Sequence, residues 1–547
     1  MEKFKIFVSK YKLLILPILF LLFTWPGALN YVSHFPDEKY YTDAAITMLE
    51  TGDILTPTQA NGTPRFLKPI VTYWVVLSSY KLFGINQFSS RIFFWLIGAL
   101  TILFTSLMVK SLTKNERKAS LAGLIMITNP LLILSSSRSI PDILLVLFLT
   151  ISVWGFLSIM VHQKPAKKYF WMAYLGAALA FETKGLPALA FAGVSILFLL
   201  VNPWQKKKIK EAFEPVSLIV AILVAASWFL AMYFNHGSSY LQSFYGDQVG
   251  ERVSIDIVTI IQHVGIAIVT LLAFFIPWSF SLVPFILNIK SKLRRQGDKE
   301  KAITLFIITW VIMIFLLSGF VFKFYDRYVL PVFPLVSFLI AGLIYEGHNK
   351  FIKPSIVVFL LFNVLLFLIE LIYFIYFKNN LIVLPGIIIS LSLIIYFILK
   401  KPNQKFPAET LAMAIIFLFF NTFLFLKPVS MPIIGTQIVR NLKLHNLEDG
   451  NKIFVYGNIR MASQIRVESH GKLDVISMDT TYTSNDTEPH VLVFAEKDRP
   501  KLDLIGYKVI IGSEEWSNLE LRDKDSFLKE YIFPIKDKGE KYLIAFQ

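Results

Sequence analysis

The sequence predicts a polytopic α-helical membrane protein with a small α/β domain at its C-terminus. Of its 547 residues, 55% are hydrophobic and 50 are phenylalanine, an apolar share above that of soluble domains. The chain contains about thirteen apolar runs of roughly the length that a helix needs to cross a bilayer. Near residue 427 the charge density rises, and short runs typical of strands follow, including Ile453 to Tyr456 and Tyr542 to Phe546.

The positive charges predict how the chain is oriented in the membrane. The formal net charge is +16, but the basic residues form short clusters between apolar runs, as orientation signals do, which argues against nucleic-acid binding. A lysine cluster between residues 3 and 12 places the N-terminus in the cytoplasm, before a first span from Tyr11 to Leu29. No small-residue cleavage site follows this span, so an uncleaved anchor is expected. The chain has no cysteine, which excludes disulfides and thiolate chemistry.

The segment from Asn30 to about Pro69 is then expected on the outer side of the membrane. Pro36 suits a first helical position and Gly52 a helix end, so a helix should lie along the membrane surface. The next apolar run, Ile70 to Phe83, is too short for a comfortable span. Treating it as a second surface helix keeps the basic cluster between residues 110 and 118 in the cytoplasm, as the positive-inside rule requires.

The remaining spans follow from the alternation of apolar runs and basic clusters. They are expected at Ile92 to Val109, Ala119 to Ser136, Ile143 to Met160, Tyr169 to Phe181, Leu186 to Val201, Pro215 to Phe234, Ile257 to Ile289, Ile303 to Phe320, Val329 to Tyr345, Ser355 to Phe377, Leu381 to Leu399 and Leu411 to Leu426. The membrane domain is therefore expected over residues 1–426, with outer juxtamembrane helices around 36–84. Residues 427–547 are expected to form a soluble extracytoplasmic (periplasmic) domain. The membrane domain is expected to lie in the cytoplasmic (inner) membrane.

Charged residues of both signs collect at the outer ends of the predicted spans. Taken singly, each has a simple explanation as a solvated or paired surface charge. Together they come from loops far apart in sequence and meet at one face of the membrane, a distribution that favours a binding or catalytic site. The residues are Asp37, Glu38, Arg65, Lys68, Arg138, Asp142, Glu182, Lys184, Arg252, Lys323 and Arg327.

An ordered series of motifs carries a resemblance to a known family over essentially the whole chain. The motifs are Pro36-Asp37-Glu38-x-x-Tyr41, Phe66-x-Lys68-Pro69, Thr183-Lys184-Gly185, Pro277-Trp278 and Lys323 through Tyr328. In this order they resemble the bacterial lipid A aminoarabinose transferases. Those enzymes belong, with the protein O-mannosyltransferases, to the GT-C glycosyltransferases.

The resemblance implies the GT-C fold and transfer of a sugar from a polyprenyl phosphate to a hydroxyl or phosphate of lipid A, a related glycan or a protein. The transfer is expected to invert the configuration of the anomeric carbon. Such a displacement needs a base for the acceptor proton and cations for the departing lipid phosphate. By position in the motifs, Asp37 is the expected base. The expected donor-phosphate ligands are Lys68, Arg252, Lys323, Arg327 and Tyr328, and the expected acceptor or supporting residues are Glu38, Arg65, Arg138, Asp142 and Lys184.

At two positions this sequence differs from the aminoarabinose transferases, and both differences affect the expected cofactor and donor sugar. Their zinc-holding residues are replaced by Leu67 and Gln248, so neither a metal site nor any other cofactor is expected. The same replacements leave the donor sugar open and allow a neutral hexose. The segment from Lys323 to Tyr328 is closer to mannosyltransferase-like relatives.

Two other classes of protein stay open at the level of the sequence. A transporter or flippase of lipid-linked sugars would show repeated halves and polar groups near the membrane midplane, whereas these charges gather at one face. A non-catalytic envelope scaffold would tolerate the loss of both Asp37 and Lys68. Glu370, an acid inside an apolar run, is assigned to helix packing because it lies far from the other charged residues.

Overall fold

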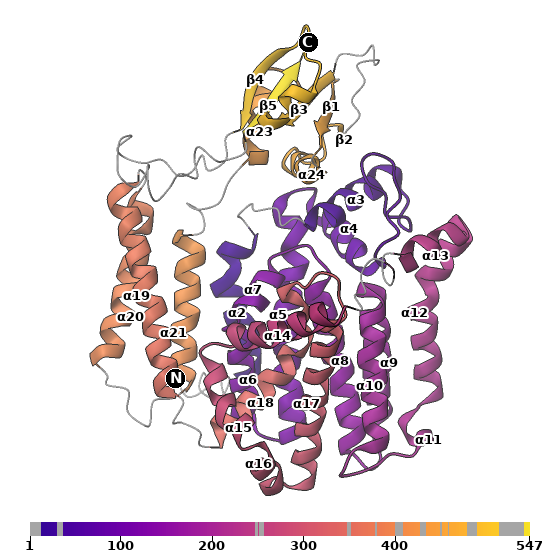
Figure 1. Cartoon of the computed structure of the whole chain (residues 1–547), viewed down its shortest axis with the longest axis vertical. Helices are drawn as coiled ribbons and strands as arrows, with labels where there is room; N and C mark the ends of the chain where they lie inside the picture. The colour runs from indigo at the N-terminus through magenta and orange to yellow at the C-terminus, as the bar shows by residue number, and fades with distance from the viewer. Residues whose placement is uncertain are drawn as a thin grey trace.

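A bundle of helices carries a small sheet domain at one end (Figure 1). The computed structural model describes residues 12–29, 37–246, 250, 256–346, 352–377, 380–399, 408–426, 434–448, 451–457, 459–478, 490–513 and 541–546. Within these residues, nine helices are long and apolar enough to cross a membrane, one bent pair passes the same test, and three further apolar helices are shorter. The predicted class of a multi-pass helical membrane protein is confirmed.

The helices follow the predicted apolar runs closely. Their bounds are α2 (Lys12–Leu29), α3 (Glu38–Thr51), α4 (Val71–Phe83), α5 (Gln87–Thr113), α6 (Glu116–Ile127), α7 (Pro130–Ser136), α8 (Asp142–Val161), α9 (Lys167–Lys184), α10 (Leu186–Val201), α11 (Ile209–Ala212), α12 (Pro215–His236), α13 (Ser238–Tyr245), α14 (Ile257–Phe274), α15 (Leu282–Leu287), α16 (Ile289–Arg295), α17 (Asp298–Gly319), α18 (Phe333–Tyr345), α19 (Ile352–Tyr376), α20 (Leu384–Leu399) and α21 (Ala408–Asn421). Short 3₁₀ helices include η2 (Trp278–Ser281) and η3 (Asp326–Val332).

The span expected from Ala119 to Ser136 is two helices, α6 and α7, that meet at an angle of 67°. Asn129 caps α7, because its side-chain oxygen accepts hydrogen bonds from the backbone nitrogens of Leu131 (3.0 Å) and Leu132 (3.2 Å). Pro130 follows at the first helical position, where its missing N–H costs nothing. The sequence predicted one apolar run here and did not show the break, because hydropathy averages over it.

The apolar run from Ile257 to Ile289 is also broken, after Phe274. Pro277 interrupts the helical hydrogen bonding, since it has no N–H and disfavours a helical residue before it. The following η2 is anchored by the indole nitrogen of Trp278, which donates to the hydroxyl of Thr128 at 2.8 Å. The chain therefore turns here instead of continuing as one helix.

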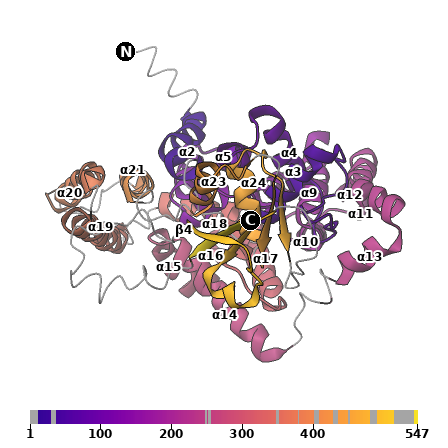
Figure 2. The same ribbon diagram turned by 90° about the horizontal axis from the view of Figure 1, so that it is seen from above.

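Helices α3 and α4 lie at the end of the bundle that carries the sheet domain (Figures 1 and 2). α3 ends at Gly52, whose backbone has φ +77° and donates to the carbonyl of Met48 at 3.1 Å. Every residue of α3 from Tyr41 to Met48 is buried, because α3 packs against both α4 and the C-terminal domain.

The C-terminal domain is a five-stranded mixed sheet with two helices, which confirms the predicted α/β class. Its strands are β1 (Lys452–Tyr456), β2 (Val475–Met478), β3 (His490–Ala495), β4 (Lys508–Ser513) and β5 (Tyr542–Phe546), in the order β2-β1-β3-β5-β4. β1 pairs in parallel with both β2 and β3, whereas β5 is antiparallel to β3 and β4. Its helices are α23 (Ile434–Leu444) and α24 (Ile459–Glu468), and α24 faces α3.

Candidate active site

The start of α3 is fixed by a buried ion pair. Glu38 accepts two hydrogen bonds from the guanidinium of Arg91 on α5, at 3.0 and 2.7 Å. The backbone nitrogen of Ser139 donates to the same carboxylate at 2.8 Å. The two charged side chains are 1% and 2% exposed. Glu38 is therefore a structural residue that positions its neighbour Asp37, because a buried carboxylate is stable only when its lone pairs are satisfied.

Asp37 and Asp142 alternate with two cations at the end of the bundle that carries the sheet domain. Arg327 of η3 donates to the Asp37 carboxylate, and its Nε lies 3.4 Å from Asp142 Oδ2. The ammonium of Lys184, the last residue of α9, lies 2.5 Å from Asp142 Oδ1. Four segments that are distant in sequence thus meet in one chain of opposite charges.

The side chains of Asp37 and Asp142 differ in solvent exposure. The Asp142 side chain is 3% exposed and holds both cations, whereas the Asp37 side chain is 38% exposed. Asp37 precedes α3 as its N-terminal cap residue, yet its side chain makes no capping hydrogen bond. Its carboxylate therefore remains available to a ligand while Arg327 orients it.

A polar cavity of about 590 Å³ opens onto these groups. It is lined by Asp37, Tyr40, Tyr41, Gln59, Asn61, Arg65, Leu67, Lys68, Pro141, Asp142, Lys184, Tyr325, Arg327, Tyr328, Gly457, Ile459, Ser477 and Met478. Arg65 is buried, with its guanidinium 3.8 Å from the centre of the Tyr40 ring. Burial raises the pKa of the Tyr41 phenol, and nearby Tyr73 adds to the effect, so this tyrosine stays protonated at neutral pH.

An apolar cavity of about 340 Å³ adjoins the polar one and shares Lys68, Lys184 and Tyr328 with it. Its other lining residues come mainly from α10, α17 and the segment after α17, and all but Ser318 are apolar. Leu186 and Phe320 at this cavity are 42% and 47% exposed on the apolar surface of the bundle. Two cations and a phenol thus stand where a polar and a hydrocarbon compartment meet, an arrangement that suits an anionic headgroup on a lipid tail.

The structure brings seven of the sequence-predicted residues to the polar cavity: Asp37, Arg65, Lys68, Asp142, Lys184, Arg327 and Tyr328. Lys323 is exposed beside the ring of Tyr325 and does not line either cavity in the part of the chain that the structure describes. Glu38 and Arg138 lie behind the cavity wall, and Arg252 lies outside the described residues.

Several lining residues were not predicted from the sequence. Gln59 and Asn61 belong to a hairpin between Thr58 and Pro64, which the Asn61-Gly62 turn pair could have indicated. Gly457, Ile459, Ser477 and Met478 come from the C-terminal domain, and no local pattern marks them. Within the described residues, no three His, Asp or Glu side chains form a metal-binding group. Gln248 lies outside those residues, so the expected absence of zinc stays a prediction.

The sequence and the fold of this chain are similar to those of known proteins. Residues 67–230 match the family described as dolichyl-phosphate-mannose-protein mannosyltransferase. The solved structure of ArnT from Cupriavidus metallidurans superposes with a TM-score of 0.71, covering 98% of both chains at 14% identity. The chain resembles the GT-C glycosyltransferases. The same ArnT bound to undecaprenyl phosphate gives a TM-score of 0.70 over 97% of both chains, at 14% identity.

Sequence relatives agree with this resemblance. The undecaprenyl phosphate-alpha-4-amino-4-deoxy-L-arabinose arabinosyl transferase of Pectobacterium atrosepticum is 27% identical over 54% of this chain and 52% of its own length. The enzyme of the same name from Yersinia enterocolitica is 30% identical over 36% of each chain. An uncharacterized protein of Aquifex aeolicus is 28% identical over 73% of this chain and 76% of its own. The alignments with the named transferases thus span about half of those proteins or less, and together the matches indicate a glycosyltransferase.

The different surroundings of the adjacent carboxylates predict effects of different size on stability. Glu38→Gln should lower the free energy of unfolding by about 3–5 kcal/mol, because it removes the carboxylate that pairs with the buried Arg91. Asp37→Asn should change it little, because Arg327 keeps Asp142 as a partner. Thermal unfolding of the two purified variants in one detergent measures the difference. Equal losses in both would contradict the structural role of Glu38.

Proposed function

We propose that the chain transfers a sugar from a polyprenyl-phosphate donor to a hydroxyl or phosphate of an envelope glycan such as lipid A. The single observation that carries this proposal is the junction of the two cavities at Lys68, Lys184 and Tyr328. A polyprenyl-phosphate sugar has the same order of parts: hydrocarbon, phosphate and saccharide. The named relatives act from undecaprenyl phosphate, and the ArnT neighbour was solved with undecaprenyl phosphate, which supports this donor class.

In this proposal the donor lies across the junction. Its hydrocarbon tail occupies the apolar cavity, and its phosphate accepts hydrogen bonds from Lys68 and Tyr328. Lys184 adds a second positive charge beside the phosphate, while Asp142 holds that lysine in place. The sugar then extends into the polar cavity toward Asp37.

The bond changes follow from this placement. The acceptor oxygen attacks the anomeric carbon while the Asp37 carboxylate takes the hydroxyl proton. The bond between the anomeric carbon and the phosphate oxygen breaks, and the polyprenyl phosphate leaves with its charge stabilised by Lys68 and Lys184. Attack from the side opposite the phosphate inverts the anomeric configuration. Arg327 orients the base throughout.

The cavity is proposed to face the extracytoplasmic side of the cytoplasmic membrane. The lysine cluster before α2 and the basic residues between 110 and 118 support a cytoplasmic N-terminus. With this orientation the C-terminal domain and the reaction both lie outside the cytoplasm, where the envelope acceptors are.

Protein O-glycosylation is the second candidate, and the match of residues 67–230 to a protein mannosyltransferase family favours it. The bond changes would be the same, with a Ser or Thr hydroxyl as the acceptor. Mass spectrometry of envelope lipids and proteins from cells with intact or altered Asp37 separates the two candidates. A sugar lost from lipid A favours the first and a sugar lost from proteins the second, whereas no change in either would favour a transporter or a scaffold.

Asp37→Asn should reduce transfer from the lipid-linked sugar by about 10²–10⁴-fold, the usual contribution of a general base. Initial rates of the purified variant, at saturating donor, measure the loss. Binding of undecaprenyl phosphate should be unchanged, which shows that the site is intact. Full activity of the variant would eliminate Asp37 as the base.

Lys68→Met should weaken binding of undecaprenyl phosphate about 10- to 100-fold, as expected for a lost hydrogen bond to a charged group. Lys81→Met is the matched control, since Lys81 is an exposed lysine on α4. Titration of the purified protein with undecaprenyl phosphate measures both. Equal affinities for the two variants would remove Lys68 from the phosphate site.

We also propose that transfer needs no zinc, because Leu67 offers no ligand where the aminoarabinose transferases hold the ion. Treatment with a strong chelator should leave the initial rate unchanged, and added zinc should not increase it. A rate that falls on chelation and returns with zinc would contradict the proposal.

A further inference from the structure

The C-terminal domain forms part of the polar cavity, at the carboxyl ends of two parallel strands. Gly457 and Ile459 follow β1, and Ser477 and Met478 end β2. In the register of the sheet Val455 pairs with Ser477, so the two strands end at the same edge. Ligands commonly bind at this edge of parallel strands. Here the edge closes the outer half of the cavity that contains Asp37.

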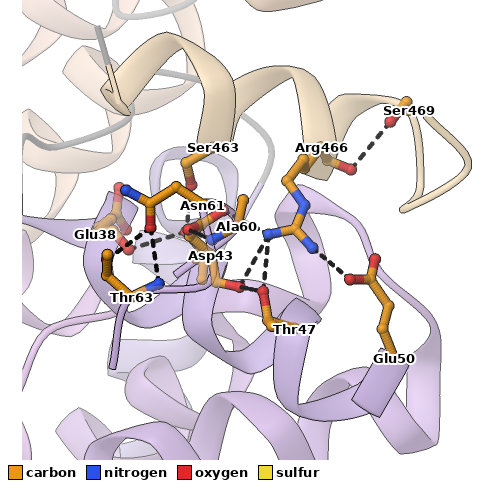
Figure 3. Close-up of polar contacts among 11 residues, drawn as sticks. Glu38, Asp43, Thr47, Glu50, Ala60, Asn61, Thr63, Ser463, Arg466 and Ser469 are labelled. Atoms are coloured by element: carbon orange, nitrogen blue, oxygen red, sulfur yellow. Dashed lines mark hydrogen bonds and ion pairs between the residues drawn. The ribbon is translucent and has the colours of Figure 1, made fainter. Parts of the chain in front are cut away.

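The domain is held there by helix α24, which packs on α3 through a buried arginine (Figure 3). The guanidinium of Arg466 donates to the Asp43 carboxylate at 2.6 Å, to Thr47 Oγ1 at 3.1 Å and to the Glu50 carboxylate at 2.7 Å. The side chains of Arg466 and Asp43 are 4% and 1% exposed. Separating the domains would break the ion pairs of Arg466 with Asp43 and Glu50.

Asp43 also holds the opposite wall of the cavity. Its second carboxylate oxygen accepts from the backbone nitrogen of Ala60 at 2.9 Å, within the 58–64 hairpin (Figure 3). The next residue, Asn61, lines the cavity and accepts from the backbone nitrogen of Thr63 at 3.1 Å. One carboxylate thus sets the spacing between the hairpin and the C-terminal domain.

We propose that this outer half of the cavity is the acceptor subsite, and that the C-terminal domain is a fixed wall of it, held by the Asp43–Arg466 pair. The inference rests on the proposed transfer function. Where the 58–64 hairpin and the C-terminal domain line the cavity, Gln59, Asn61 and Ser477 offer amide and hydroxyl groups. Such groups exchange hydrogen bonds with hydroxyls, so the subsite fits a saccharide portion of the acceptor. Arg466 is a positioning residue, since it lies outside the cavity lining.

Locking the domain tests whether the wall is fixed. The hydroxyl oxygens of Thr42 on α3 and Ser463 on α24 lie 2.9 Å apart, and the chain has no cysteine of its own. In the Thr42→Cys/Ser463→Cys variant, a mild oxidant such as copper phenanthroline can join the two thiols as a disulfide. The locked protein should keep the rate and the KM for lipid A, with the undecaprenyl-phosphate sugar as donor. Loss of turnover on locking, restored by reduction, would show a moving lid and overturn the proposal.

Releasing the domain tests the role of the ion pair. Arg466→Met should raise the KM for lipid A at least tenfold and leave the KM for the donor unchanged. Joining positions 42 and 463 in the same variant should restore the wild-type KM, which a general loss of folding would not allow. Arg440→Met, at an exposed arginine on α23, is the matched control and should have no effect. An unaltered acceptor KM in Arg466→Met, or no rescue after complete cross-linking, would overturn the proposal.

The acceptor class is tested with two probes, lipid A and a threonine-rich peptide. Asn61→Ala and Ser477→Ala should each raise the KM for lipid A several-fold, with donor binding unchanged. If the peptide is glycosylated and its KM rises in the same way, the saccharide assignment is wrong. If the unaltered protein binds undecaprenyl phosphate but transfers sugar to neither probe, the proposed function itself fails. Failure of the acceptor-subsite proposal alone would look different: the unaltered protein would transfer the sugar to lipid A, and Arg466→Met would not change the KM for lipid A.

Discussion

Buried pairs of opposite charge hold together the end of the bundle next to the sheet domain. Asp37, Arg327, Asp142 and Lys184 form one chain of opposite charges, and Glu38 pairs with Arg91 beside it. Each pair joins segments from distant parts of the sequence. Because an unpaired charge in this position is costly, the pairs fix the relative positions of the helix ends. The geometry of the cavity depends on this constraint.

Pairing leaves one carboxylate accessible. Asp142 is enclosed by two cations, and Glu38 is enclosed by Arg91 and a backbone N–H, whereas Asp37 keeps an open side. The residues that could act chemically are thus distinguished from their neighbours by burial and not by residue type. Lys68 and Tyr328 line both the polar cavity and the adjoining apolar cavity, so they lie at the boundary between polar and apolar surroundings.

Sequence reasoning reached the helical class because it follows from hydropathy and from the distribution of lysine and arginine. Motif order named seven of the residues that line the polar cavity. Sequence reasoning gave Asp37 and Glu38 different roles only through the order of the family motifs, since the difference in their burial comes from tertiary packing. It missed the breaks at Asn129-Pro130 and near Pro277, because averaging over an apolar run conceals a local interruption. The contributions of Ser477 and Met478 arise from tertiary docking across more than four hundred residues, as the Thr42 and Ser463 contact illustrates.

The rim of the apolar cavity, at Leu186 and Phe320, is part of the exposed apolar surface of the bundle. A lipid-linked donor would therefore enter sideways, without its tail leaving the bilayer. Its encounter with the protein becomes a two-dimensional diffusion problem, governed by donor molecules per unit area of membrane. Saturation would follow the mole fraction of donor among the lipids, and diluting a vesicle suspension with buffer would not change it.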